Sequence, residues 1–388
     1  MPCGLCGASP DRYDPDSTEI TEATILHGIA VRRSGQARGW VAACCAAAGL
    51  AAVVTTAALA AATTNASSAW TLKLATRYFP PASNHSQYDI VLLVRGRAWF
   101  LGGSNVAGAG VPEAEYRTDG RWFSAPLPAG THSWIDAASA TSRGDIWAVT
   151  YLGGSLLRWD GTRWTTERNG GWKARTQFTG ILALSARDVW LFGASGRRHA
   201  GAGTWHLSGS RWTRVRGAAA DLAQASAASP TDVWGIGGTG GSVTALLHLR
   251  GTAWHRVRPA ALAGFRYSRI AALSPRNVWV AGTVAGAARL GHYDGRRWTT
   301  LRMPGQVAAT GMCRDGNGGL WVIANAGRGP SVVLDRSAGG TWTKAKVSSS
   351  AADELLACAW LPGTRAAWGA GKAAAPLGTA AAAYGYGR

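Results

Sequence analysis

The stretch SPTDVWGIGG, residues 229–238, sets a pattern that the chain repeats. Close variants are SRGDIWAV (142–149), SARDVWLFG (185–193) and SPRNVWVAG (274–282). Each begins with turn-forming residues, because Pro fixes a turn dihedral and Ser, Asp or Asn can bond nearby backbone N–H groups. A tryptophan then begins a short run that is typical of a β-strand. We therefore expect a turn followed by a strand at each occurrence.

Two series of tryptophans give the length of the repeat. The first series opens the strand after this turn, and the second follows a turn such as DGTRW (160–164). Both recur about every 45 residues, and four strand-length runs fit in each period, which is the signature of a β-propeller blade. The first series is Trp99, Trp147, Trp190, Trp234, Trp279, Trp321 and Trp368, and the second is Trp122, Trp164, Trp212, Trp254, Trp298 and Trp342.

The strand after the first turn is apolar on both faces, as in the run Val189, Trp190, Leu191 and Phe192. Such a sheet must be covered on both faces, which blades packed in a ring provide. The second series has no seventh member after Trp368, but Trp70 stands in a similar sequence ahead of the first repeat. We therefore expect an all-β, seven-bladed β-propeller over residues 63–388. An N-terminal strand should complete the last blade and leave no open edge.

An apolar, alanine-rich segment at residues 41–62 follows three arginines. This order is typical of a signal peptide, and the alternative is a transmembrane helix. We favour cleavage, because few residues of the segment are strongly apolar. Residues 1–40 should be a disordered extension, or a stretch that contains the true start at Val31. The protein should therefore be exported, either secreted or membrane-tethered on the extracytoplasmic side, and should meet the membrane only through this N-terminal segment.

The chain is strongly basic, with 40 lysines and arginines against 21 acids and a formal charge of +19. Such a charge suits an anionic partner, for example nucleic acid or an anionic wall polymer. Many arginines, however, stand directly before the tryptophan of the second turn, which distributes them around a rim instead of forming one patch. We favour the rim, and export argues against nucleic acid as the partner.

The chain has six cysteines, which could form a disulfide or bind a metal. Cys313 and Cys358 fall at similar points of two successive repeats, so they could form a disulfide in an exported protein; two free thiols are the alternative. The single CxxC at residues 3–6 is too little for zinc, which needs four ligands. No GxSxG, P-loop or HExxH sequence occurs. We expect no metal and no cofactor.

Few acids lie outside the repeat turns, and Glu113 and Glu115 share one face of an outer strand, a poor place for catalysis. Two sets of polar residues recur at fixed repeat positions and are therefore interpreted as structural: Asp145, Asp188 and Asp232 in turns, and His206, His248 and His292 in strands. We expect a non-catalytic binding or scaffold protein. The alternative is a hydrolase or lyase with an acid and a base at the mouth of the propeller channel.

The sequence DGNGGLWVIANAG (315–327), together with DGTRW, resembles tectonin-type and related propeller repeats over about residues 70–388. Long exported propellers of this composition also resemble actinobacterial surface proteins. Tectonin-type proteins are often lectins, so the resemblance implies sugar binding. The expected partner is a glycan, an anionic cell-surface polymer or a protein.

The repeats stop matching in the connections between blades, which cross the face of a propeller where ligands usually bind. Aromatic side chains beside arginine in these connections could stack on sugar rings or hold an anionic group. The alternative is that they pack the crossovers. The candidate binding residues are His132, Trp134, Trp172, Phe178, Phe265, Arg266 and Tyr267.

Overall fold

A computed structural model describes residues 71–78, 83–151, 154–167, 178–193, 203–215, 221–239, 242–306, 308–325, 331–348, 354–360, 367–375 and 378–386. Residues 1–40, the segment 41–62 and the candidate Trp172 lie outside these described residues. No helix within the described ranges is long and apolar enough to cross a membrane. The regular elements of these ranges are 28 strands and two short 3-10 helices.

Six runs of four antiparallel strands follow one another, and each run forms a blade. The first contains β2 (Ser83–Val94), β3 (Arg97–Val106), β4 (Ala109–Thr118) and β5 (Arg121–Ser124). The second contains β6 (Ile135–Ser142), β7 (Asp145–Thr150), β8 (Leu156–Trp159) and β9 (Trp164–Glu167). The third contains β10 (Gly180–Ser185), β11 (Asp188–Phe192), β12 (Trp205–Ser208) and β13 (Arg211–Arg214).

The next three blades have the same plan. The fourth contains β14 (Asp221–Ser229), β15 (Asp232–Thr239), β16 (Ser242–Arg250) and β17 (Ala253–Val257), and the 3-10 helix η1 (Ala260–Leu262) follows it. The fifth contains β18 (Arg266–Ser274), β19 (Asn277–Val284), β20 (Ala287–Tyr293) and β21 (Trp298–Arg302), followed by η2 (Pro304–Gln306). The sixth contains β22 (Ala308–Arg314), β23 (Leu320–Asn325), β24 (Val332–Arg336) and β25 (Trp342–Ser348).

The last three strands of the chain lie in one sheet with the first strand. β26 (Glu354–Trp360), β27 (Ala367–Ala375) and β28 (Gly378–Tyr386) form an antiparallel series. β1 (Thr71–Tyr78) then pairs antiparallel with β28, with Lys73 opposite Gly385. An N-terminal strand thus lies beside the C-terminal strands, at the place where the sequence lacked its last outer strand.

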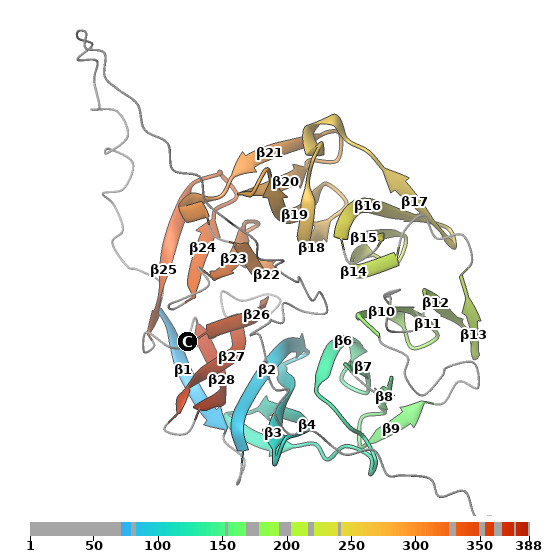
Figure 1. Ribbon diagram of the computed structural model, residues 1–388, viewed down its shortest axis with the longest axis vertical. Coiled ribbons are helices and arrows are strands. Elements are labelled where there is room, and N and C mark those ends of the chain that lie inside the picture. Colours follow the sequence, from blue (N-terminus) through green and yellow to red (C-terminus); the bar gives the residue numbers. More distant parts are fainter. Residues whose placement is uncertain are drawn as a thin grey trace, which may run out of the picture.

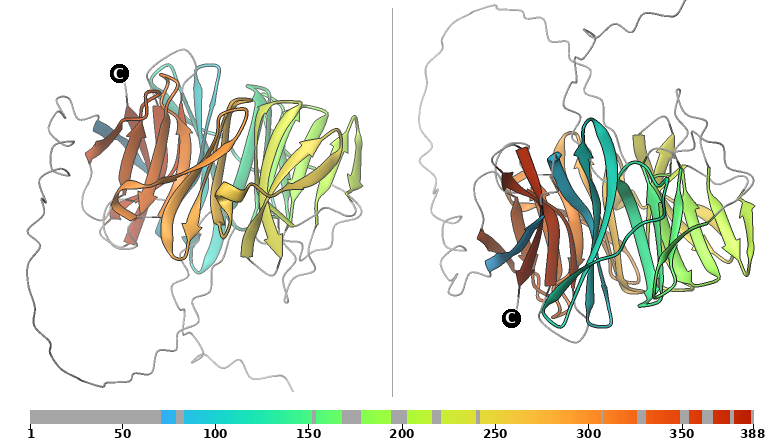
Figure 2. Two further views of the ribbon diagram at one scale, coloured as in Figure 1. Left: turned by 90° about the horizontal axis from the view of Figure 1, so that it is seen from above. Right: turned by 90° about the horizontal axis from the view of Figure 1, so that it is seen from below.

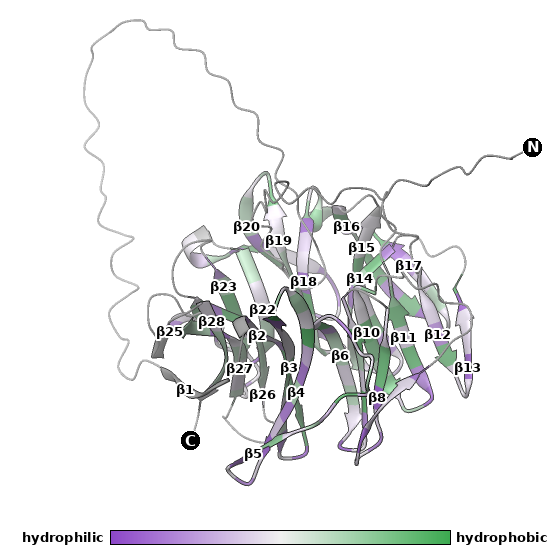
Figure 3. Ribbon diagram, turned by 60° about the horizontal axis from the view of Figure 1, so that its bottom comes forward, coloured by the Kyte–Doolittle hydropathy of each residue, from purple (hydrophilic) through white to green (hydrophobic). Residues whose placement is uncertain are grey.

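The strands form a ring with the first strand of each blade innermost and the fourth outermost (Figure 1). Seen from the side, the blades stand next to one another with their strands crossing the thickness of the ring (Figure 2). Hydrophobic residues run along the strands, and hydrophilic residues collect at the turns (Figure 3). The protein is therefore an all-β propeller, as the repeat predicted.

The two tryptophan series meet between neighbouring blades. A tryptophan on the second strand of one blade contacts a tryptophan of the fourth strand of the next blade. The ring centroids are 5.8 Å apart for Trp99 and Trp164, 6.2 Å for Trp147 and Trp212, 5.6 Å for Trp190 and Trp254, and 5.5 Å for Trp234 and Trp298. All four pairs have the edge-to-face geometry that aromatic rings prefer. The period of about 45 residues is thus the spacing at which successive blades fit together.

The polar residue before each tryptophan has a structural role. Asp232 Oδ1 accepts a hydrogen bond of 3.0 Å from Trp234 Nε1 and lies 2.9 Å from His248 Nε2, and the His248 ring stacks on Trp234. In the next blade Asn277 bonds Trp279 and His292 in the same way. No group of three or more His, Cys, Asp or Glu within the described ranges could hold a metal ion. The recurring acids and histidines therefore hold each blade together.

A disulfide joins Cys313 on β22 to Cys358 on β26, whose Cα atoms are 5.8 Å apart. Both cysteines lie on innermost strands (Figure 1). The bond therefore links the sixth blade to the first of the three C-terminal strands.

Candidate functional site

The two faces of the ring differ in how far they repeat. Turns of the SPTD and DGTRW kinds lie together on one face, and a Cβ on Gly144 of one turn would lie 3.3 Å from the Asp160 carbonyl of the other. We call this the turn face. The opposite face, which we call the entry face, is where each innermost strand begins and where the connections that do not repeat arrive. A ligand site that is not repeated by every blade is therefore expected at the entry face.

Near the entry face, six innermost strands contain a β-bulge at the same point of the repeat. A bulge leaves one residue unpaired and redirects its side chain, and bulges are frequent beside functional sites. The unpaired residues are Asp89, Asp136, Ala223, Ser268, Thr310 and Leu356. Only the first two carry an ionisable group, and they belong to neighbouring blades.

Asp89 and Asp136 are only 8% and 7% exposed. The Gln87 side-chain amide donates a hydrogen bond of 2.6 Å to Asp89, whereas Asp136 Oδ2 has no hydrogen-bond partner among the residues that the structure describes. Burial raises the pKa of Asp136 to about 7, although the charge of Arg269 acts in the opposite direction. Burial also raises the pKa of Asp89 well above its usual range, and the charge of Asp136 raises it further. The charges of the two carboxyls therefore interact, and both side chains are buried.

Arg269 on β18 provides a buried positive charge that faces Asp136. Its side chain donates 2.6 Å and 2.7 Å hydrogen bonds to the carbonyls of Thr310 and Ser268, and its second terminal nitrogen has no partner within the described ranges. Burial lowers the pKa of Arg269 to about 10, and the Asp136 charge opposes this shift. Arg269 and Asp136 are not among the ion pairs, which have N···O distances of 4.0 Å or less. Two buried opposite charges thus interact without direct contact.

A second group of polar residues extends this site along β26, β27 and β2. Lys372 and Glu354 form an ion pair of 2.9 Å, and Asn325 donates a 2.7 Å hydrogen bond to Glu354. Burial lowers the pKa of His85, and the charge of Lys372 lowers it further. His85 therefore stays neutral at physiological pH, and Glu354 already has a cation partner.

Trp134 covers the outer side of this polar site. Its ring stacks on His85 at a centroid distance of 5.4 Å, and its Nε1 donates to the Ser104 carbonyl at 3.2 Å. A Cβ on Gly103 would lie 2.7 Å from the Trp134 ring, so only glycine fits there. Trp134 remains half-buried, and the neighbouring His132 is exposed. These two candidates from the sequence therefore lie at the entry face beside the buried acids.

Three other candidates are buried. Phe178, Phe265 and Tyr267 are 0%, 4% and 7% exposed, and they belong to hydrophobic clusters between blades. They fill the space where a connection enters the next innermost strand, which is the packing alternative. Arg266 is exposed beside them.

The sequence did not single out Asp89, Asp136 and Arg269 as a site. Asp89 and Asp136 resembled other acids outside the turns, because neither stands in a chemical motif. Aligning the repeats on their first tryptophan does not place them at one position, because Asp136 stands eleven residues before Trp147 and Asp89 only ten before Trp99. Strand pairing shows the shared position, since each acid lies three residues before the residue that pairs with that tryptophan. The sequence could not connect Arg269 to Asp136, because the two residues belong to blades that are not successive and are related only by the curvature of the ring.

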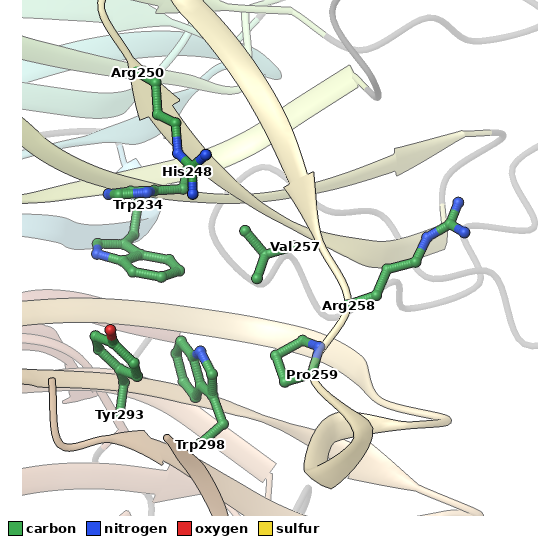
Figure 4. Close-up of a pocket in the computed structure, with 8 residues that line it drawn as sticks. All are labelled: Trp234, His248, Arg250, Val257, Arg258, Pro259, Tyr293 and Trp298. Atoms are coloured by element: carbon green, nitrogen blue, oxygen red, sulfur yellow. The ribbon is translucent and has the colours of Figure 1, made fainter. Parts of the chain in front are cut away.

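A hollow of about 310 Å³ lies elsewhere, at the outer rim between the fourth and fifth blades (Figure 4). Trp234, Tyr293 and Trp298 form its aromatic side, and Arg250 and Arg258 lie at its edge. The residues that line this hollow do not include the acids of the entry face.

No protein-family model matches the chain. No curated protein matches it either. Among solved structures, YCF48 bound to a D1 peptide is similar, with a TM-score of 0.56 at 13% identity, covering 82% of this chain and 93% of that chain. Virginiamycin B lyase from Staphylococcus aureus with quinupristin gives 0.58 at 12%, covering 79% and 98%. U3-55K gives 0.57 at 8%, covering 80% and 98%. These similarities show the fold alone: the chain shares the β-propeller architecture of these proteins.

Proposed function

We propose that this chain is an exported, non-catalytic binding or scaffold propeller that holds a protein partner at its entry face. In this proposal the ring has seven blades, the last one formed by β26, β27, β28 and β1. Residues 41–62 direct export and are removed afterwards.

The observation that carries the proposal is the placement of Asp89 and Asp136. At the same bulge, other innermost strands have neutral residues, and the hydroxyls of Ser268 and Thr310 donate to the carbonyls of the next innermost strand. An ionised carboxylate cannot donate such a bond. Burying a carboxyl oxygen that has no hydrogen-bond partner among the described residues, as for Asp136 Oδ2, is unfavourable for folding. Folding does not require a buried carboxyl at this bulge and is opposed by it, so we infer that the carboxyl serves function.

A protein partner fits the surroundings of these acids better than a small substrate does. The half-buried Trp134 and the exposed His132 offer an aromatic surface beside these acids, of the kind that is enriched at protein interfaces, and the exposed Arg266 begins β18 on the same face. Among the structures with this fold, YCF48 is bound to a peptide.

A lyase or hydrolase is the second candidate, and one observation favours it. A carboxyl with a pKa of about 7, such as Asp136, suits general acid–base catalysis. Virginiamycin B lyase shows that an enzyme occurs on this fold. In that case Asp136→Asn would abolish turnover of a substrate found by screening, whereas a binding protein would show no turnover in either form.

Photocrosslinking in the producing cell tests the proposal. Benzoylphenylalanine replaces His132 on the entry face, and Arg276, an exposed residue of the turn face, provides the matched control position. We expect a crosslinked polypeptide from position 132 and none from position 276, with a lower yield when Trp134→Ala is added. Equal crosslinking from both positions, or none from position 132, would refute a protein partner at the entry face.

A further inference from the structure

The hollow between the fourth and fifth blades presents aromatic rings to solvent. Trp298 is half-buried, as are the tryptophans at the same repeat position in three other blades, Trp122, Trp212 and Trp342. Tyr293 stacks on Trp298 at 5.4 Å and is also half-buried. Two aromatic rings are thus accessible side by side here.

The floor of the hollow is held rigidly. Trp234 is only 5% exposed, and its Nε1 is bonded to Asp232, which also holds His248. The His248 ring lies on Trp234 with a centroid distance of 4.2 Å. A preformed surface of this kind binds without first having to be ordered.

The edge of the hollow is positively charged. Arg250 and Arg258 are exposed, and neither has an ion-pair partner in the part of the chain that the structure describes. In Figure 4 the guanidinium of Arg250 lies beside His248 at the hollow, while that of Arg258 points outward. The nearby acids are already engaged, because Asp232 bonds His248 and Asp294 lies 3.9 Å from Arg297. The unpaired charge at this edge therefore attracts anions.

We propose that this hollow binds one acidic sugar unit of an anionic polysaccharide, with the ring of the sugar against Tyr293 and Trp298 and its carboxylate at Arg250. A volume of about 310 Å³ is at the lower end for ligand pockets, which suits one sugar ring. Guanidinium groups form charge-assisted hydrogen bonds with carboxylates. Because the site is at the outer rim, a polymer held there leaves the entry face free, and one molecule can bind both partners.

Binding of glucuronic acid and of glucose to the exported chain tests this site. The two sugars have the same ring, but only glucuronic acid carries a carboxylate. Ligand-observed NMR and calorimetry should show binding of glucuronic acid, and binding of glucose at least about tenfold weaker, the ratio expected for one hydrogen bond to a charged group. Equal affinity for both sugars, or no binding of glucuronic acid, refutes the proposal, as does binding of benzoate in preference to glucuronic acid.

Two substitutions locate the site. Arg250→Gln should weaken glucuronic acid binding about tenfold. Arg211→Gln is the matched control, because Arg211 is an exposed arginine on the outer strand β13 that does not line the hollow. It removes the same charge from the rim and should change the affinity less than about twofold. Equal effects of the two substitutions would show a general effect of charge and refute the site.

A third substitution tests the hollow without changing charge. Val257→Phe places a larger side chain at the centre of the hollow and should abolish binding of both sugars. Both arginines are exposed, so their variants keep the fold even if Val257→Phe does not, and thermal unfolding of each variant checks this. Undiminished binding by a folded Val257→Phe protein overturns the proposal.

Discussion

The carboxyl of Asp136 should lower the free energy of unfolding as the pH rises. Asp136→Asn should remove the contribution of this one carboxyl. The pKa of Asp136 rises from an ordinary value of 3.8 to about 7 in the folded protein because the carboxyl is buried. Between these values the folded protein holds a proton that the unfolded chain has released. Stability therefore falls as the pH increases through this window, and the loss is complete above about pH 7.

The size of the effect follows from the shift of about three pH units, which corresponds to about 4 kcal/mol above pH 7. At pH 5 the same linkage gives only about 1.5 kcal/mol. Asn is neutral at both values. The stability of Asp136→Asn relative to the unsubstituted protein should therefore increase by about 2.5–3 kcal/mol between pH 5 and pH 8.5. Because the substitution also leaves Arg269 without a facing charge, the increase between the two pH values is the quantity to measure.

Urea unfolding, followed by tryptophan fluorescence at the two pH values, gives the free energies of unfolding. Asp160→Asn is the control, because backbone hydrogen bonds from Arg163, with further bonds from Thr162, lower the pKa of this exposed carboxyl to about 2. Its contribution is lost only below the window of the experiment, so its effect should not change between pH 5 and pH 8.5. If the relative stability of Asp136→Asn is also unchanged, or declines, the carboxyl is not buried in an unfavourable charge state.

Three further predictions concern the scaffold. Asp232→Ala should lower the free energy of unfolding by about 2–3 kcal/mol, because it leaves two ring nitrogens without an acceptor, whereas Asp232→Asn should cost less than about 1 kcal/mol, since Asn277 has this role in the next blade. Both values come from urea unfolding. Gly103→Ala should displace the Trp134 ring and lower the crosslinking yield at the entry face, and an unchanged yield would contradict the packing described above. Deletion of β1 should expose the edge of β28 and cause aggregation, measured by light scattering; a monomeric product of equal thermal midpoint would contradict the role of β1.

The architecture could be predicted because its determinants are local and repeated. The turn SPTD, the tryptophan after it and the turn DGTRW recur in sequence, and the structure shows that these residues contact one another within a blade or between successive blades. Even the missing outer strand was visible as an absent tryptophan, and β1 pairs with β28 at that place. A periodic sequence reports contacts that recur with the same period.

The site could be predicted only in part, because its contacts are neither local nor repeated. Trp134 was identified as an aromatic residue that the repeat does not require, but the same reasoning selected Phe178, Phe265 and Tyr267, which are buried. Sequence gives the type of a side chain in a connection, and burial depends on how the connection crosses to the next blade. The charges of Asp136 and Arg269 interact between strands of different blades, a relation that no spacing in the sequence contains.

The repeat also explains why function is expected at the entry face and at one opening of the rim. A residue such as Asp232 is constrained, because it bonds a tryptophan and a histidine of its own blade. The bulge near the entry face is constrained only in its backbone, so Ala223 and Leu356 occupy it as readily as Asp136. A carboxyl at such a position can be gained without disturbing the contacts between blades, at a cost in stability that the pH experiment measures directly. A partner that binds the ionised carboxyl would stabilise the folded protein and offset this cost. At pH 8.5 the protein should therefore unfold at a higher urea concentration when the partner is present.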